Sequence, residues 1–125
     1  MKKELLVIFG FILLLLMLKF GVRIFIVTSG SMEPHLKTGS IVVTSRKSNY
    51  LTGDVIAFKP SNYLIVHRIE GVLEEKFSTK GAANTAVDVK SVSQNQVLGK
   101  VLFSLPYVGY FLKFCLTFQG FLMLV

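Results

Sequence analysis

IVVTSRKSNYLTGDVIAF, residues 41–58, contains two short apolar runs separated by polar and turn-forming residues. The first run, Ile41–Thr44, is built of β-branched side chains, which fit a pleated strand better than a helix. Thr52-Gly53-Asp54 then turns the chain into the second run, Val55–Phe58. Because both runs are short and bounded by turn signals, the stretch predicts two strands of a β domain.

Further along the chain, similar runs recur at Tyr63–Ile69, Val72–Thr79 and Val97–Leu105, with a polar loop over Lys80–Asp88. No helical period stands out between residues 28 and 107. Five or six strands at this spacing predict a mainly β fold, a compact antiparallel sheet or small barrel. The chain has 125 residues, which leaves room for one such domain.

The start of the chain is strongly apolar. The protein is 52% hydrophobic with a mean hydropathy of +0.61, which is high for an ordinary soluble domain. Leu5–Leu18 contains no charge, and continuing past Lys19 and Arg23 to Val27 gives 23 residues, enough to span a bilayer as a helix. We therefore expect an N-terminal transmembrane anchor over residues 1–27. A cleaved signal peptide is the alternative, but no Ala-x-Ala-like site follows Leu18.

A second apolar stretch, Val108–Val125, closes the chain and is interrupted only by Lys113 and Gln119. We expect a second apolar transmembrane helix over residues 108–125, with a buried or interfacial helix as the alternative. Residues 28–107 remain for the β-rich domain. The single cysteine, Cys115, excludes an internal disulfide and is interpreted as a small apolar filler.

The charge distribution narrows the class of partner. The net charge is +7, but residues 28–107 carry only nine Lys and Arg against six Asp and Glu. The remaining excess lies next to the apolar segments, where anionic lipids attract it. No basic run interleaved with aromatic residues occurs, which argues against a nucleic-acid partner.

Ser29-Gly30-Ser31-Met32-Glu33-Pro34 follows the first apolar segment and has the composition of a sharp, exposed turn. Ser31 is a candidate nucleophile, but a serine hydroxyl needs a neighbouring base to take its proton. His67 lies in a strand-like run and shares a face with Ile65 and Ile69, whereas His35 points along the serine turn itself. His67 is therefore the preferred base, and a buried structural histidine is the alternative.

A histidine base usually needs an acceptor on its second ring nitrogen. Asp88, at the end of the Lys80–Asp88 loop, is one candidate, and Asp54 is the other, although its Gly-Asp turn suggests a bond to its own backbone. The backbone N–H of Ser31 and the hydroxyl of Ser29 are the local donors for an oxyanion hole. Because the base must be neutral, activity is expected to fall in acid.

Several motifs occur together and in order over about residues 20–110: Ser29–Pro34, Gly53–Phe58, Val66-His67-Arg68-Ile69, Thr79-Lys80-Gly81, Gly99-Lys100-Val101 and Pro106–Tyr110. This set resembles the type I signal peptidases, and specifically the endoplasmic-reticulum and archaeal-type subgroup. There a histidine stands where ordinary bacterial enzymes have a lysine. The resemblance implies Ser31 as nucleophile, His67 as general base, Asp88 as its acidic partner and Ser29 in the oxyanion hole. It implies no metal and no cofactor.

The resemblance also implies a substrate and a location. Members of the family cleave the signal peptides of secretory preproteins at the outer membrane face, after small residues at the cleavage position and two before it. The substrate is expected to bind as an extended strand along a domain edge. The implied partners are these signal peptides and the lipid bilayer, with further membrane subunits left open. The implied location is the plasma membrane, or the endoplasmic reticulum membrane in a eukaryote.

One residue departs from the family pattern. An acidic residue commonly follows the Thr-Lys-Gly motif, and here that position is Ala82. If Asp88 suffices, the chain is an active peptidase; if it does not, the chain is a weak or inactive binding or assembly subunit. The LexA-like proteases share a related serine-based fold, but they are soluble and use lysine as base, so His67 and the apolar ends argue against them.

Overall fold

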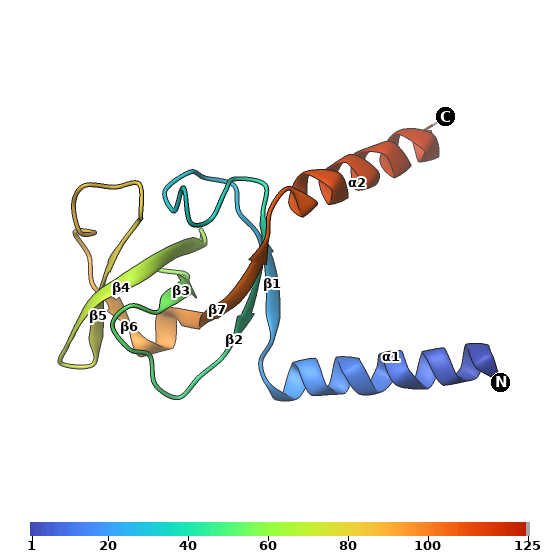
Figure 1. Ribbon diagram of the computed structural model, residues 1–125, viewed down its shortest axis with the longest axis horizontal. Helices are drawn as coiled ribbons and strands as arrows, with labels where there is room; N and C mark the ends of the chain where they lie inside the picture. The colour runs from blue at the N-terminus through green and yellow to red at the C-terminus, as the bar shows by residue number, and fades with distance from the viewer. Residues whose placement is uncertain (125) are drawn as a thin grey trace.

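The computed structural model describes the backbone of residues 1–124 and the side chains of residues 1–118. Figure 1 shows a β domain with one helix at each end of the chain, and both helices leave the domain on the same side. The elements, in chain order, are α1 (Lys2–Lys19), β1 (Arg23–Ile26), β2 (Ile41–Ser45), β3 (Val55–Phe58), β4 (Ile65–Leu73), β5 (Lys76–Lys80), β6 (Val92–Ser93), the 3-10 helix η1 (Gln94–Gln96), β7 (Val97–Leu105) and α2 (Val108–Leu124).

The strands form one antiparallel sheet in the order β1-β2-β7-β3-β4-β5-β6. Register shifts between Val43 and Thr44, Ala57 and Phe58, and Ile69 and Gly71 interrupt the ladders. Bulges of this kind bend a strand and increase its twist, which suits the curled sheet seen in Figure 1. The expected mainly β, antiparallel fold is therefore confirmed.

Two details of the strand prediction were wrong. The run Val72–Thr79 is not one strand, because Glu74 and Glu75 adopt positive φ values of 50° and 63° and turn β4 back into β5. The segment Arg23–Ile26, assigned from its apolar sequence to the membrane anchor, is the edge strand β1 and pairs with β2 over four residues.

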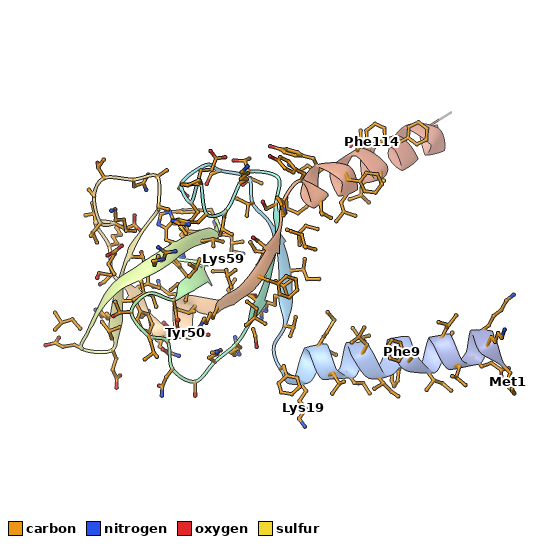
Figure 2. The ribbon with its side chains drawn as sticks, in the orientation of Figure 1. Met1, Phe9, Lys19, Tyr50, Lys59 and Phe114 are labelled. Atoms are coloured by element: carbon orange, nitrogen blue, oxygen red, sulfur yellow. The ribbon has the colours of Figure 1, made fainter. Side chains whose placement is uncertain are left out.

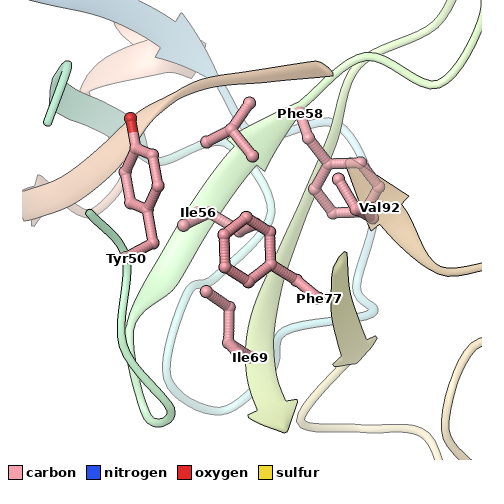
Figure 3. Packing of buried hydrophobic residues seen from close by; sticks show 7 residues of the cluster. Tyr50, Ile56, Phe58, Ile69, Phe77 and Val92 are labelled. Atoms are coloured by element: carbon pink, nitrogen blue, oxygen red, sulfur yellow. The ribbon is translucent and has the colours of Figure 1, made fainter. Parts of the chain in front are cut away.

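The larger apolar cluster is formed by side chains of β3 to β7 together with Tyr50 from the loop before β3, and Figure 3 shows its packing. Tyr50 and Phe77 meet edge to face, with their ring centroids 6.0 Å apart. The cluster anchors β3, β4 and β5 to one another. It thereby fixes the strands that carry His67 (β4) and Thr79 (β5). Its buried members are Tyr50, Ile56, Phe58, Ile69, Phe77, Val92 and Val97.

A second apolar cluster lies under the loop that joins β1 to β2. Its buried members are Met32, Leu36 and Val42. Met32 is only 1% exposed, although it stands in a polar turn sequence, so it anchors that loop to the sheet. Partly buried side chains complete this serine-loop cluster: Phe25, Val27, Val55, Val66, Ala82 and Val101.

The helices expected at the two ends are present, but their predicted membrane-spanning character is not supported. Within residues 1–124, no helix is both long enough and apolar enough to cross a bilayer. α1 ends at Lys19, and Gly21 then takes a positive φ of 60° that leads into β1, so the expected helix up to Val27 was wrong. The 18 residues of α1 also include four charged side chains: Lys2, Lys3, Glu4 and Lys19.

The start of α2 is hydrogen-bonded to the loop between β1 and β2 (residues 27–40), called the serine loop from here on. The Gly109 N–H donates to the Gly39 carbonyl over 2.9 Å, and the Gly39 N–H donates to the Val27 carbonyl over 2.8 Å. Gly39 has φ +84°, and a β-carbon there would lie 2.1 Å from the ring of Tyr110, so only glycine fits. Beyond these first contacts, α2 extends away from the domain, as does α1, with side chains in the open (Figure 2).

Candidate active site

Ser31 sits on the loop between β1 and β2, at the edge of the serine-loop cluster. The Glu33 N–H closes a turn on the Gly30 carbonyl over 3.1 Å. Met32 points into the sheet and is buried, while Ser31 stays partly exposed. The Ser31 carbonyl also accepts a hydrogen bond of 2.9 Å from the Ala83 N–H, which ties this turn to the loop after β5.

His67 lies in β4, where it pairs with Ile56 of β3. Its ring is largely buried, with a side-chain exposure of 9%, and packs edge to face on Phe58. The Nε2 atom of His67 lies 3.1 Å from the Oγ of Ser31, within hydrogen-bond distance. Two residues 36 positions apart in the chain are thus brought together in the geometry that a nucleophile and its base require.

The other ring nitrogen of His67 meets Asp88. The Nδ1 atom lies 2.6 Å from the Asp88 Oδ2, and the Asp88 side chain is 26% exposed. The hydroxyl of Thr79 donates to the same carboxylate oxygen over 2.6 Å, and the Asp88 N–H donates to the Thr79 carbonyl over 2.8 Å. Because Thr79 is fully buried, it gives Asp88 a fixed attachment to β5.

Asp54, the rival acidic partner, is engaged elsewhere. Its carboxylate accepts a hydrogen bond of 3.0 Å from the Leu51 N–H and pairs with Lys100 at 3.0 Å. Burial acts to raise the pKa of Asp54, but the Leu51 bond and the nearby charges of Lys100 and Lys47 together lower it below its ordinary value. Asp54 therefore serves its own turn and the β7 strand.

His35 stays exposed on the serine loop, and none of the hydrogen bonds found among the described side chains involves its ring. Ser29 lies closer to the centre of the site. Its hydroxyl is 3.3 Å from that of Ser31. An oxyanion formed next to Ser31 would find both this hydroxyl and the Ser31 N–H within the same short segment.

Two residues that the sequence offered only as parts of a motif take part in this arrangement. Thr79 holds Asp88, as described above. At Gly81, a β-carbon would lie 2.5 Å from the Ser31 carbonyl oxygen and 3.0 Å from the His67 Nε2, so any side chain there would push the two apart. The motif Thr79-Lys80-Gly81 was the available signal, but nothing in it indicated either contact.

Ala82 belongs to the serine-loop cluster and takes no part in the described contact between His67 and Asp88. Its N–H lies 3.3 Å from the Met32 sulfur, and its side chain packs with apolar neighbours. The carboxylate that contacts His67 comes instead from position 88. The departure from the family pattern at position 82 thus leaves the contacts among Ser31, His67 and Asp88 in place.

A cleft of about 600 Å³ opens beside Ser31 and His67. One wall is the end of β1 and the residues after it, and the other is the segment that leads into β4. Among the strands that the structure describes, β1 pairs with β2 alone and β5 joins β4 from Arg68 onward, so both walls offer unpaired strand edges. The lining residues are Ile26, Val27, Thr28, Ser29, Ser31, Met32, Leu36, Tyr63, Leu64, Ile65, Val66 and His67.

Comparisons with known proteins find similarity over most of the chain. The family model for signal peptidase, peptidase S26, matches residues 2–98. Signal peptidase I W of Bacillus subtilis (strain 168) is 38% identical to this chain over an alignment of 96 residues, and the match covers 70% of the chain and 50% of that protein. The chain thus spans about half the length of the curated relative that it matches.

Proposed function

The chain belongs to the signal peptidase family, peptidase S26, and we propose that it is a serine endopeptidase that removes signal peptides from exported preproteins. The observation that carries the proposal is the contact series from Ser31 through His67 to Asp88. It consists of an Oγ to Nε2 distance of 3.1 Å and an Nδ1 to Oδ2 distance of 2.6 Å. A hydroxyl, an imidazole and a carboxylate in this order can generate a nucleophile at neutral pH.

In the proposed mechanism, His67 carries its proton on Nδ1 and donates it in a hydrogen bond to Asp88. Its Nε2 is then free to accept the proton of the Ser31 hydroxyl as the oxygen attacks the scissile carbonyl. The resulting imidazolium is stabilised by the Asp88 carboxylate and returns the proton to the leaving amine. Water, activated by the same nitrogen, then hydrolyses the acyl-enzyme and releases Ser31.

The negative charge that develops on the carbonyl oxygen needs donors beside Ser31. We assign this role to the Ser31 N–H and the Ser29 hydroxyl, which lies 3.3 Å from the nucleophile. Among the described hydrogen bonds, none uses the Ser31 N–H, so it is available to an incoming oxygen. Both donors are part of one turn that Met32 anchors in the core.

The cleft supports an extended substrate that pairs with the strand edges on either side of it. Backbone hydrogen bonds of this kind bind peptides of varied sequence, while pockets at alternate positions select the side chains. Buried Met32 and Leu36 lie in the lining. We infer that pockets beside these residues exclude bulky side chains by sterics, so that small residues are accepted at the cleavage position and two positions before it.

The proposed location is a membrane surface, with the β domain on the extracytoplasmic face. Two features support it: the apolar helices α1 and α2 leave the domain on the same side, and their side chains are largely exposed over residues 2–19 and 110–118. Large exposed apolar surfaces on a folded chain normally contact a lipid or a partner. At such a surface the site would meet signal peptides while they are still in the bilayer.

The decisive experiment reconstitutes the purified chain with one labelled preprotein and maps the cut by mass spectrometry. Cleavage after a small residue is expected. Ser31→Ala and His67→Ala should each lower kcat by at least about a thousandfold, and Asp88→Ala should also lower it strongly, because the three groups act as a unit.

His35→Ala is the matched control, because it removes an imidazole from the same loop without touching the proposed base. Its kcat should stay within about twofold of the wild type. The proposal would be overturned by a His67→Ala variant with full activity. A wild-type chain that binds the preprotein without cutting it would instead identify a binding subunit.

A further inference from the structure

A basic pocket lies where α1 ends and the chain enters the sheet. Two segments form it: the last residues of α1 with the turn that follows, and the start of the loop between β2 and β3. Its volume is about 420 Å³, and three of its seven lining residues are cationic while none is acidic. The residues that define this basic pocket are Leu18, Lys19, Phe20, Gly21, Arg46, Lys47 and Ser48.

The backbone holds the two segments together. The Arg46 N–H donates to the Gly21 carbonyl over 3.3 Å, and the Ser45 hydroxyl donates to the Phe20 carbonyl over 3.1 Å. Gly21 has φ +60°, and a β-carbon there would lie 2.9 Å from the Arg46 β-carbon. Glycine at this position therefore allows both the turn and the close approach of Arg46, so the cations are placed by the fold.

The positive charge of the pocket is not neutralised by ion pairs. Among the residues whose side chains are described, the ion pairs join the N-terminal amine to Glu4, His67 to Asp88 and Lys100 to Asp54. Lys47 is near enough to Asp54 to help lower the pKa of that carboxyl, but Asp54 already pairs with Lys100. An anion is the ligand that this surplus of positive charge favours.

The rim of the pocket is apolar. Leu18 is 69% exposed and Phe20 is 58% exposed, and both stand beside the cations in the lining. Figure 2 shows Lys19 at the corner where α1 joins the domain. Cations next to exposed apolar side chains match the boundary between headgroups and acyl chains, where lysine and arginine stems also lie favourably. A free phosphate would use the cations but would gain nothing from the apolar rim.

We propose that the basic pocket binds the phosphate-bearing headgroup of an anionic phospholipid, with Leu18 and Phe20 against its acyl chains. The inference rests on the membrane location given under the proposed function. Lys19, Arg46 and Lys47 neutralise the headgroup, and this contact sets the height and orientation of the β domain above the lipid. Because the pocket shares no lining residue with the catalytic cleft, it acts on position and takes no part in the chemistry.

The test uses the full chain carrying Ser31→Ala in zwitterionic detergent micelles, so that its outcome does not depend on proteolysis. Short-chain phosphatidylglycerol is titrated in, with phosphatidylcholine of the same chain length as the matched lipid. Backbone amide shifts of Gly21 and residues 46–48 are followed by NMR. We expect saturable shifts with phosphatidylglycerol and binding at least tenfold weaker with phosphatidylcholine.

Arg46→Gln combined with Lys47→Gln should weaken the phosphatidylglycerol affinity by about 25-fold, since each basic residue near an anionic surface contributes about a factor of five. The charge-preserving exchange of Arg46→Lys with Lys47→Arg should retain it. The control pair Lys59→Gln and Lys76→Gln removes the same charge from exposed positions outside the pocket and should change the affinity less than twofold.

Three outcomes would overturn the inference. Equal affinity for the two lipids would show that headgroup charge is not recognised. An equal loss in the control pair would show that only the net charge of the protein matters. If inorganic phosphate shifted the same amides with the same affinity, the ligand would be free phosphate and not a lipid. None of these outcomes bears on whether Ser31 cleaves preproteins.

Discussion

At the scale of single residues, the site depends on one carboxylate oxygen. The Oδ2 of Asp88 accepts hydrogen bonds from His67 and from Thr79, each over 2.6 Å. In the proposed mechanism His67 takes and returns a proton, whereas the fully buried Thr79 takes no part in the chemistry. We therefore infer that Thr79 is a positioning residue, which holds the Asp88 carboxylate in place while His67 reacts.

Thr79→Val tests this role, because valine keeps the shape of the side chain and removes the donor. We expect kcat to fall by roughly 10- to 100-fold with KM little changed, since the lost bond orients the proposed base and does not touch substrate. Losing a hydrogen bond to a charged group should also lower the free energy of unfolding by about 1.5–3 kcal/mol. Thr79→Ser restores the hydroxyl and should recover most of kcat, and a serine variant as slow as valine would contradict the role.

Gly81→Ala is expected to damage the same site by a different route. The added methyl would lie 2.5 Å from the Ser31 carbonyl, a backbone atom that cannot easily move away. The Ser31 to His67 distance should lengthen and kcat should fall by about tenfold or more, because small misplacements of reacting groups are costly. Gly10→Ala in α1, where nothing lies within 4 Å of the new methyl, is the control for a simple glycine effect.

The residue types of the site could be predicted from the sequence, but its contacts could not. Ser31 and His67 were singled out by their local context, and the structure places their reacting atoms 3.1 Å apart. Between the two aspartates, the local pattern favoured Asp88, because the Gly-Asp turn of Asp54 suggests a bond to its own backbone. Only the fold shows that Asp54 is occupied by Leu51 and Lys100 while Asp88 faces the imidazole. Such partners are set by long-range strand pairing.

At the scale of elements, the turn before β3 is a small electrostatic unit. Asp54 accepts a bond from the Leu51 N–H and pairs with Lys100 of β7, and so joins a turn to a neighbouring strand. Its pKa is raised by burial but lowered further by the Leu51 bond and the two lysines, with a net shift downward. Asp54 therefore stabilises the fold only while it is ionised.

Asp54→Asn should lower the free energy of unfolding at pH 7 by about 1–2 kcal/mol, since an amide replaces a charged acceptor. A depressed native pKa contributes stability that is fully present above the unfolded value, near 3.9, and is lost as the pH falls through the native value. The difference between variant and wild type should therefore shrink below about pH 4. Denaturant unfolding at pH 7 and pH 3 measures it, and a difference independent of pH would contradict the linkage.

Elements were predictable where their sequence was long and periodic. β3 and β7 coincide with the runs of β-branched and aromatic residues that predicted them, and β2 extends its run by one residue. β4 begins inside the run Tyr63–Ile69 but continues to Leu73. β6 is only two residues long and carries no such pattern. β1 was hidden because an apolar edge strand next to an apolar helix reads as one continuous segment until Gly21 turns the chain. The sheet pairing of Arg23–Ile26 with β2 overrides that local pattern.

At the scale of the whole molecule, much of the apolar surface is exposed and not buried in the core. Almost every side chain of α1 is exposed, and exposed apolar side chains continue over β7 and the described part of α2. Monomeric soluble proteins rarely expose apolar patches of this extent. The exposed members on β7 and at the start of α2 include Leu102, Phe103, Leu105, Tyr110 and Phe111.

In buffer without detergent or lipid, the full chain is therefore expected to self-associate. Adding a mild detergent above its critical micelle concentration should return it to a single protein copy per micelle. Deleting residues 2–18 should reduce the self-association, because it removes the largest continuous part of the exposed apolar surface. Sedimentation velocity measures both effects, and a monodisperse, detergent-free monomer of the full chain would refute the expectation.

The contact between Gly39 and the start of α2 has a consequence for protein engineering. Gly109 and Tyr110 brace the segment that runs through Gly39 and Val27 towards the nucleophile. A chimera that exchanges the tail of this chain for that of another protein must therefore preserve the glycine and the tyrosine at its junction. A graft made after residue 111 leaves the brace intact, whereas one made at residue 107 would cut it.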